Sequence, residues 1–145
     1  MKNKAIYFDM DGTIADLYGV EGWLADLTAS KIRPYAEAKP MVRMSRLARR
    51  LNALQKEGYK ICVISWLAKN GSAEYGEAVT MAKKQWLNKH LASVKFDEVK
   101  IVAYGTPKQT LGNGILFDDE KANRDKWGDG AYEPKEIFKV LAQLA

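Results

Sequence analysis

The sequence predicts an α/β protein in which a mainly parallel β-sheet carries helices on both faces. Short apolar runs at residues 5–8, 59–64 and 114–117 alternate with longer segments whose apolar residues recur at helical spacing. This alternation is typical of strands joined by crossover helices, and such crossovers produce parallel sheets. Each of the three runs is followed by a polar residue, which is where the ligand-binding edge of such a sheet lies.

The first half of the chain contributes two strands and two helices to this prediction. Residues 5–8 form the first strand, and residues 21–32 form a short helix before the breaks at Arg33-Pro34 and Lys39-Pro40. Residues 41–57 form a stronger helix that ends at Gly58, and residues 59–64 form a buried strand. The apolar side of the first helix would consist of Trp23, Leu24, Leu27 and Ile32.

The second half continues the same alternation. A helix is expected at residues 74–91, strands at 99–103 and 114–117, and a last helix at 134–144 with Ile137, Phe138, Leu141 and Leu144 facing inward. Between the strands, Thr106 and Pro107 are expected to begin a short helix as its cap and first residue. The whole chain, residues 1–145, would then be a single Rossmann-like domain, with roughly residues 15–40 as a small helical cap segment inserted after the first strand.

Composition limits the class of protein and the kind of metal site. Of the 145 residues, 47% are hydrophobic and 28% are charged, which is typical of a globular domain without a membrane-spanning run. The first four residues do not resemble a secretory signal, and the single cysteine, Cys62, suits a reducing compartment as a buried apolar residue, so we expect a cytoplasmic protein. One cysteine and one histidine exclude the usual zinc sites, so a metal would be held by oxygen ligands, as magnesium, calcium and manganese are.

The chain is basic, with a net charge of +5 and a pI near 9.2, which favours anionic partners. Part of this charge is concentrated on the helix at residues 41–57, as Arg43, Arg46, Arg49 and Arg50. A solvated helix face explains these arginines, and a contact with nucleic acid is the alternative. The sequence predicts no particular oligomeric state.

The motif Asp9-Met10-Asp11-Gly12-Thr13 directly follows the first apolar run. Two carboxylates one residue apart at the end of a strand can divide a reaction, one attacking or binding a metal while the other transfers protons. A plain turn is the alternative, because Asp-Gly pairs favour turns. A calcium-binding EF-hand loop is excluded, because the glycine comes too early and Val20 stands where the last acidic ligand is required.

Polar side chains at three distant strand ends predict one site. Asp9, Ser65 and Asp118 each follow the last apolar residue of a predicted strand. Because parallel strands end at the same edge of the sheet, these side chains are expected to converge there. Taken singly, these residues would be interpreted as caps or surface residues, and this applies to Ser65, Lys108 and the pair Asp118-Asp119. Their expected convergence at one edge of the sheet favours a catalytic site.

The order of these residues resembles the haloacid dehalogenase superfamily of phosphohydrolases, whose motifs are an Asp-x-Asp pair, a Ser or Thr, a Lys and a closing acidic pair. The resemblance implies Asp9 as nucleophile and Mg²⁺ ligand, and Asp11 as general acid and base whose carbonyl also binds the metal. It further implies that Asp118, assisted by Asp119, completes the magnesium site. Phosphate would be bound by Ser65 and Lys108, with Gly12 allowing a tight turn whose amides face it.

A second, narrower likeness concerns residues 84–91 and 108–119, which look similar to the 5′(3′)-deoxyribonucleotidase branch of that superfamily. We therefore expect a magnesium-dependent phosphohydrolase acting on a small phosphomonoester, with a nucleoside monophosphate as the leading substrate. Tyr18, Trp23 and Tyr35 in the cap segment would either stack on a base or serve packing. The alternatives are a phosphatase of nucleic-acid ends, a non-catalytic binding protein with the same fold, and a structural protein.

Overall fold

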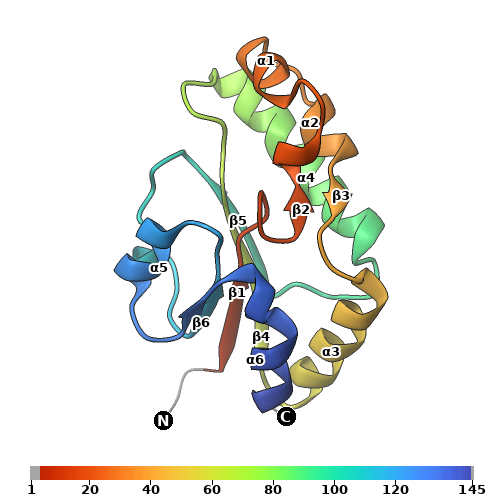
Figure 1. Ribbon diagram of the computed structural model, residues 1–145, viewed down its shortest axis with the longest axis vertical. Helices are drawn as coiled ribbons and strands as arrows, with labels where there is room; N and C mark the ends of the chain where they lie inside the picture. Colours follow the sequence, from red (N-terminus) through yellow and green to blue (C-terminus); the bar gives the residue numbers. More distant parts are fainter. Residues whose placement is uncertain (1–3, 145) are drawn as a thin grey trace.

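A parallel five-stranded β-sheet forms the centre of the protein, which is described here by a computed structural model covering residues 4–144 (Figure 1). The strand order is β5-β4-β1-β6-β7, so the first strand in sequence lies in the middle. The strands are β1 (Ala5–Phe8), β4 (Lys60–Trp66), β5 (Glu98–Val102), β6 (Ile115–Phe117) and β7 (Ala131–Tyr132). This topology places the carboxyl ends of β1, β4 and β6 side by side, as the predicted site requires.

Alternating side chains of the central strands build two separate apolar layers. Ile6 and Phe8 of β1 belong to a layer packed against α3 (Met44–Lys56), α4 (Ala73–His90) and α6 (Ile137–Leu144). Ala5 and Tyr7 face the opposite side, where Trp127 of α5 (Lys121–Trp127) covers the sheet. Since helices cover both faces, every residue of β1 is buried, which explains its uninterrupted apolar sequence.

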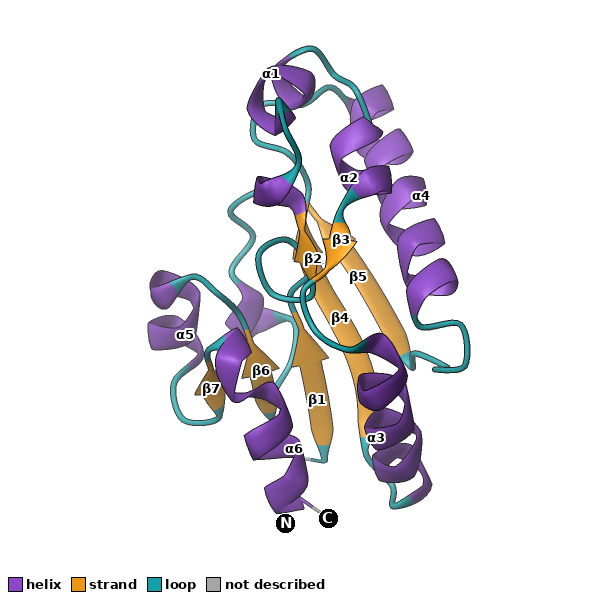
Figure 2. Cartoon of the chain, turned by 45° about the vertical axis from the view of Figure 1, so that its right-hand side comes forward, coloured by secondary structure: helices purple, strands orange, loops and turns teal. Residues whose placement is uncertain are grey.

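Residues 15–40 form a small unit at the carboxyl edge of the sheet, at the top of the view in Figures 1 and 2. It contains the short strands β2 (Ala15–Asp16) and β3 (Lys39–Pro40), the 3₁₀ turn η1 (Leu17–Gly19), and the helices α1 (Trp23–Thr28) and α2 (Arg33–Glu37). The antiparallel pair β2–β3 closes its base.

Two side chains of α4 fasten this unit to the rest of the fold. The Trp86 indole donates to the carbonyl of Ala38 at 2.7 Å, and the Tyr75 hydroxyl donates to the carbonyl of Lys31 at 2.7 Å. Both donors are buried, so each bond satisfies a polar group that would otherwise destabilise the core.

The prediction of one continuous helix at residues 21–32 is wrong in its bounds. The chain instead forms α1 and α2, separated by a turn in which Ser30 adopts a positive φ of 59°. Pro34 does not break the chain but lies in the first turn of α2, where its missing N–H costs no hydrogen bond. No residue of α1 is fully buried, and Leu27 is partly buried against the apolar cluster that includes Leu17 and Tyr35.

The region around Lys108 also differs from the prediction. The short 3₁₀ helix η2 (Lys108–Thr110) has Pro107 as its cap residue, and the Thr106 hydroxyl donates back to the carbonyl of Ala103 at 2.7 Å. Thr106 therefore stabilises the preceding turn and does not cap a helix.

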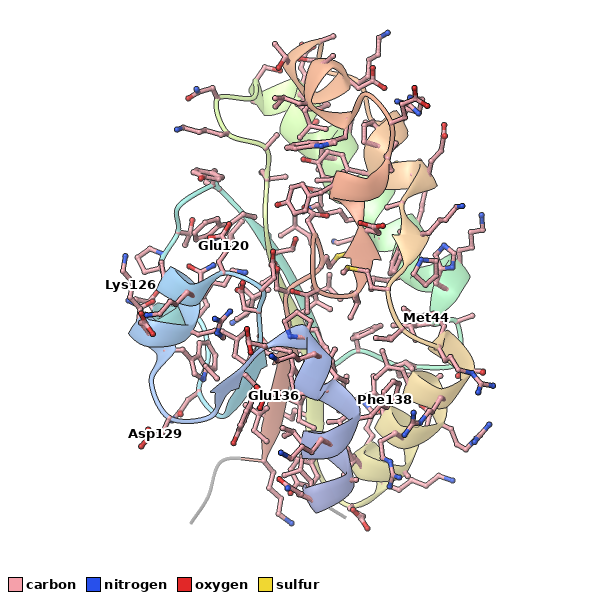
Figure 3. The ribbon with its side chains drawn as sticks, viewed as in Figure 1. Met44, Glu120, Lys126, Asp129, Glu136 and Phe138 are labelled. Carbon is pink, nitrogen blue, oxygen red and sulfur yellow. The ribbon has the colours of Figure 1, made fainter. Side chains whose placement is uncertain are left out.

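Near the C-terminus, a 3₁₀ turn η3 (Pro134–Glu136) precedes α6, whose buried residues include Val140, while Phe138 and Leu144 are only partly buried. The ring of Phe138 lies under the guanidinium of Arg46 on α3, 4.0 Å from the ring centroid (Figure 3). The short elements α5, β7, β2 and β3 were not predicted, because each is too brief for periodicity to reveal.

Two further expectations concern Cys62 and the membrane. Cys62 is 1% exposed, as predicted, and burial raises the pKa of its thiol to about 11. Among residues 4–144, none of the helices combines the length and the apolar character needed to cross a bilayer. Residues 1–3, which belong to the segment tested for a secretory signal, lie outside the described residues.

Candidate active site

The Asp9–Thr13 motif leaves β1 at the carboxyl edge of the sheet. The Asp9 amide still donates to the Phe117 carbonyl of β6 at 2.9 Å, which fixes the first carboxylate beside that strand. Gly12 then turns the chain with a φ of 81°, and a Cβ at this position would collide with the carboxylate of Asp119. The glycine is thus required both by conformation and by space. Its amide donates to the Ala15 carbonyl, within the turn.

Three carboxylates from two strand ends meet around this turn. One carboxylate oxygen from each of Asp9, Asp118 and Asp119 lies within 4.8 Å of the others. Asp118 is fully buried, and Asp9 is 7% exposed. Carboxylates are seldom buried without compensating charge, so this acidic cluster requires cations or strong hydrogen-bond donors close by.

Lys108 is the buried cation of the acidic cluster. Its ammonium donates to Asp9 Oδ1 at 2.9 Å and to Asp118 Oδ2 at 2.7 Å, with only 2% of the residue exposed. Burial acts to lower the pKa of Lys108, but the two carboxylates outweigh it, so the pKa is raised and the lysine stays charged.

Two neutral side chains complete the support of the acidic cluster. The Thr13 hydroxyl donates to Asp9 Oδ2 at 2.9 Å and accepts the Asp119 N–H at 3.2 Å. The Asn123 amide donates to Asp118 Oδ2 at 3.2 Å. Asn123 is 9% exposed and Thr13 is fully buried, so both are fixed parts of the site.

The acidic cluster carries more negative charge than Lys108 compensates. Burial, followed by the neighbouring Asp9 and Asp118, raises the pKa of Asp119 to about 8. Burial and the charge of Asp9 also raise the pKa of Asp118, against the opposing effect of Lys108. A divalent cation between these carboxylates would remove the excess charge, and an all-oxygen donor set suits Mg²⁺. The residues present therefore fit the metal that the sequence predicts.

Asp11 and Ser65 lie beside the acidic cluster but are engaged differently. The Asp11 carboxylate accepts a hydrogen bond from Lys83 Nζ at 3.0 Å, and the Ser65 hydroxyl accepts one from the same ammonium at 2.6 Å. Ser65 is fully buried within β4 and does not line the adjoining cavity. Lys83 is 1% exposed and was not singled out from the sequence, although it lies four residues after Val79, on the inward face of α4.

A cavity of about 330 Å³ opens between the acidic cluster and the 15–40 unit. Its floor contains Asp9, Asp11, Lys108, Asp118 and Asp119, which the structure brings together. The opposite wall comes from the 15–40 unit and is apolar and aromatic, formed by Leu17, Tyr18, Trp23, Leu24, Leu27 and Tyr35.

A second aromatic pair, which the sequence did not reveal, borders the same cavity from the sheet side. Trp66 and Tyr104 lie at the ends of β4 and β5 with ring centroids 5.0 Å apart. Tyr104 is 51% exposed, and Lys69 approaches its ring to 5.8 Å. The cavity thus combines one strongly polar surface with two aromatic ones, which is typical of a ligand site.

The arginines of α3 do not take part in this site. Arg43, Arg46, Arg49 and Arg50 lie at the start of α3 or within it, and none of them lines the cavity. Arg46 packs on α6 instead. The described residues therefore offer two lysines at the cavity, Lys69 and Lys108, as its positive side chains.

Comparison with known proteins supports the fold. No protein-family model matches the sequence, and no curated protein sequence matches it. Among solved structures, the chain resembles a D,D-heptose 1,7-bisphosphate phosphatase from Burkholderia thailandensis, with a TM-score of 0.58, 10% sequence identity and 98% of both chains covered. The predicted fold class, a Rossmann-like parallel sheet with helices on both faces, is confirmed.

Proposed function

We propose that this protein is a magnesium-dependent phosphohydrolase that acts through an aspartyl-phosphate, with a nucleoside monophosphate as its substrate. The observation that carries the proposal is the Asp9 carboxylate, held between Lys108 and the other acids of the acidic cluster on the floor of a ligand-sized cavity. A buried carboxylate beside a fixed cation is positioned to attack an anionic phosphoryl group, which a carboxylate in water would repel. The similar fold belongs to a phosphatase, which supports the same reaction class.

In this proposal, an oxygen of Asp9 attacks phosphorus while the bond to the leaving oxygen breaks. Asp11 gives its proton to that oxygen, and the product alcohol departs. A water molecule then attacks the phosphorus of the aspartyl-phosphate and gives its proton to Asp11, which releases phosphate and restores both residues. Lys108, already bonded to Asp9, neutralises the phosphoryl oxygens. Ser65 is fully buried beside the cavity, so the contact with these oxygens that the sequence predicts would require it to become accessible when substrate binds.

Mg²⁺ would be bound by Asp9, Asp118 and Asp119, together with the Asp11 carbonyl, and would supply positive charge that offsets repulsion between carboxylate and phosphate. Lys108 and Asn123 restrain Asp118 from one side, while Thr13 restrains Asp9 and Asp119 from another. These contacts hold the carboxylates in place before a metal arrives, so binding costs little rearrangement.

The nature of the cavity wall favours a nucleotide over a sugar phosphate. The similar phosphatase acts, by its name, on a heptose bisphosphate, and a sugar of that kind requires many hydrogen-bond donors and acceptors. The wall of the 15–40 unit instead offers the rings of Tyr18 and Trp23, which contact each other edge-on with centroids 4.9 Å apart. Aromatic rings bind planar bases by stacking, at about 1–3 kcal/mol for each base.

The alternatives have less support in the structure. A phosphatase of nucleic-acid ends needs basic side chains that follow the backbone beyond the cavity. None of the arginines of α3 lines the cavity, and Arg46 lies over the ring of Phe138 on α6. A non-catalytic binding protein would not need to bury several carboxylates together, because their burial and mutual repulsion are unfavourable and raise the pKa of Asp119.

A substrate panel tests the proposal directly. Phosphate release would be measured from nucleoside monophosphates, sugar phosphates and oligonucleotides phosphorylated at one end, each with Mg²⁺ and with a chelator. We expect the highest kcat/KM for a nucleoside monophosphate and no release with the chelator. Preference for an oligonucleotide, with KM rising steeply with salt, would support nucleic-acid ends as substrate. The absence of metal-dependent release from every compound would refute the phosphohydrolase proposal.

A further inference from the structure

Lys83 connects the two site residues that lie outside the acidic cluster. Its ammonium donates to Asp11 Oδ2 at 3.0 Å, to Ser65 Oγ at 2.6 Å and to the Trp66 carbonyl at 2.7 Å. An ammonium has three N–H donors, so these three bonds use all of them. Lys83 is 1% exposed and does not line the cavity, and it therefore has neither a free donor nor access for a substrate.

We propose that Lys83 is a positioning residue, which is anchored by Ser65 and the Trp66 carbonyl and holds the Asp11 carboxyl group toward the reacting phosphoryl group. The inference rests on the proposed function and adds a residue to its machinery. Lys83 is carried by α4, whereas Asp11 follows β1 and Ser65 belongs to β4, so one side chain sets the relative positions of groups from two strands.

The hydrogen bond to Ser65 determines the direction of the serine proton. Because Lys83 donates to Ser65 Oγ, the hydroxyl hydrogen of Ser65 cannot point back at the ammonium and must be donated elsewhere. Among the described residues no other side chain is bonded to Ser65 Oγ, so the bond from Lys83 is the side-chain contact that orients this hydroxyl.

The contact with Asp11 leaves one carboxylate oxygen for chemistry. Lys83 engages Oδ2, and among residues 4–144 no donor other than Lys83 is bonded to the Asp11 side chain. The ring of Tyr35, from the 15–40 unit, lies 5.1 Å from Lys83 Nζ and closes the remaining side of the ammonium. Together these contacts fix the position of the Lys83 ammonium, and the ammonium in turn fixes the position of the Asp11 carboxylate. A displacement of about 1 Å at such a group is enough to slow a reaction by roughly two orders of magnitude.

The test uses Lys83→Met, which removes the donors, with Lys84→Met as its matched control on the exposed face of the same helix. The kcat/KM of each variant would be measured with Mg²⁺ for a nucleoside monophosphate and for p-nitrophenyl phosphate. The alkoxide leaving group of the nucleotide needs the proton of Asp11, whereas nitrophenolate leaves without one. Misplaced Asp11 should therefore reduce kcat/KM about 100-fold for the nucleotide and about 10-fold for the aryl ester, the shared part coming from the disturbed packing at the site.

Equal reductions for the two substrates, or no reduction at all, would overturn the positioning role. Lys83→Gln, which is uncharged but still polar, is expected to show the same difference between substrates and replaces Lys83→Met if the latter does not fold. Lys84→Met should behave as the unsubstituted protein with both substrates.

Crystal structures of the unsubstituted protein and of the folded Lys83 variant provide a readout that needs no turnover. We expect the Asp11 carboxyl group to move by about 1 Å or more once Lys83 is replaced, and an unmoved Asp11 would refute the proposal. If the unsubstituted protein hydrolyses no phosphate ester, the proposed function fails, and this structural comparison still decides whether Lys83 positions Asp11.

Discussion

The two sides of the cavity are built in opposite ways. The floor is buried and charged, with Asp9 and Asp118 tied to Lys108 by hydrogen bonds shorter than 3 Å. The opposite wall belongs to the 15–40 unit and is apolar, with Leu24 62% exposed and Tyr18 47% exposed. Fixed polar groups suit the chemistry of one reaction, whereas an open aromatic wall suits the recognition of a substrate. The difference indicates that reaction and specificity are separable, and substitutions on the two sides should show it.

The largest effect is expected for Asp9→Asn on the floor. The amide cannot attack phosphorus, so Mg²⁺-dependent phosphate release should fall by about 10⁴-fold or more while the circular dichroism spectrum is unchanged. Asp125→Asn is the matched control, because Asp125 is an exposed carboxylate paired with Lys121 on α5. Activity of Asp9→Asn near that of the unsubstituted protein would exclude Asp9 as the nucleophile.

Lys108→Met should affect both activity and stability. Loss of the cation that faces the phosphoryl group should reduce kcat by about 10²–10³-fold. Leaving Asp9 and Asp118 buried without their partner should also lower the free energy of unfolding by about 3 kcal/mol in chelator. Because Mg²⁺ supplies charge to the same carboxylates, urea denaturation should show a smaller loss with the metal. A loss that is equal in both conditions would contradict a shared metal and lysine site.

Trp23→Ala tests the aromatic wall and should leave the floor intact. We expect KM for a nucleoside monophosphate to rise about 10-fold, while kcat and the kinetics with p-nitrophenyl phosphate change less than about 3-fold. Met81→Ala is the control, because Met81 is an exposed apolar residue of α4 that does not line the cavity. If KM for sugar phosphates rises as much as KM for the nucleotide, the wall does not recognise a base.

The smallest expected effect is a pH dependence of stability that arises at Asp119. Its pKa is raised to about 8 in the folded protein, so between the unfolded value near 3.8 and pH 8 the folded state binds more protons than the unfolded state. Stability in chelator should therefore fall as pH rises from 5 to 8, by roughly 5 °C in the thermal midpoint. With Asp119→Asn or with added Mg²⁺, the thermal midpoint should fall less between pH 5 and pH 8. If neither change affects the pH dependence, other groups cause it.

The convergence of Asp9 and Asp118 on the floor could be predicted because both lie at strand ends. Asp9 and Asp118 follow apolar runs, and parallel pairing of β1 with β6 brings such positions together in any fold of this class. Lys83 was missed because a lysine at helical spacing from Val79 and Trp86 resembles a surface residue until the face of α4 is known. Thr13 and Asn123 were missed because a hydroxyl or an amide is equally common in turns.

The wall could not be predicted for a related reason. The apolar residues of α1 have the spacing of a core helix, but none of them is fully buried, and Leu27 is only partly buried against an apolar cluster. Whether Trp23 and Leu24 face a core or a cavity depends on the way Trp86 and Tyr75 hold residues 31–38 against α4. Spacing along one segment contains no information about that contact.

The sequence by itself determined the parallel α/β class, the edge of the sheet at which the acids gather, and the carboxylate chemistry of that edge, because apolar periodicity and residue chemistry are local properties. The tertiary structure alone decided that Lys83 bridges Asp11 and Ser65, that Thr13 and Asn123 support the carboxylates, and that an aromatic wall faces them. These features depend on distances between segments far apart in the chain, which only the packing of helices against the sheet establishes.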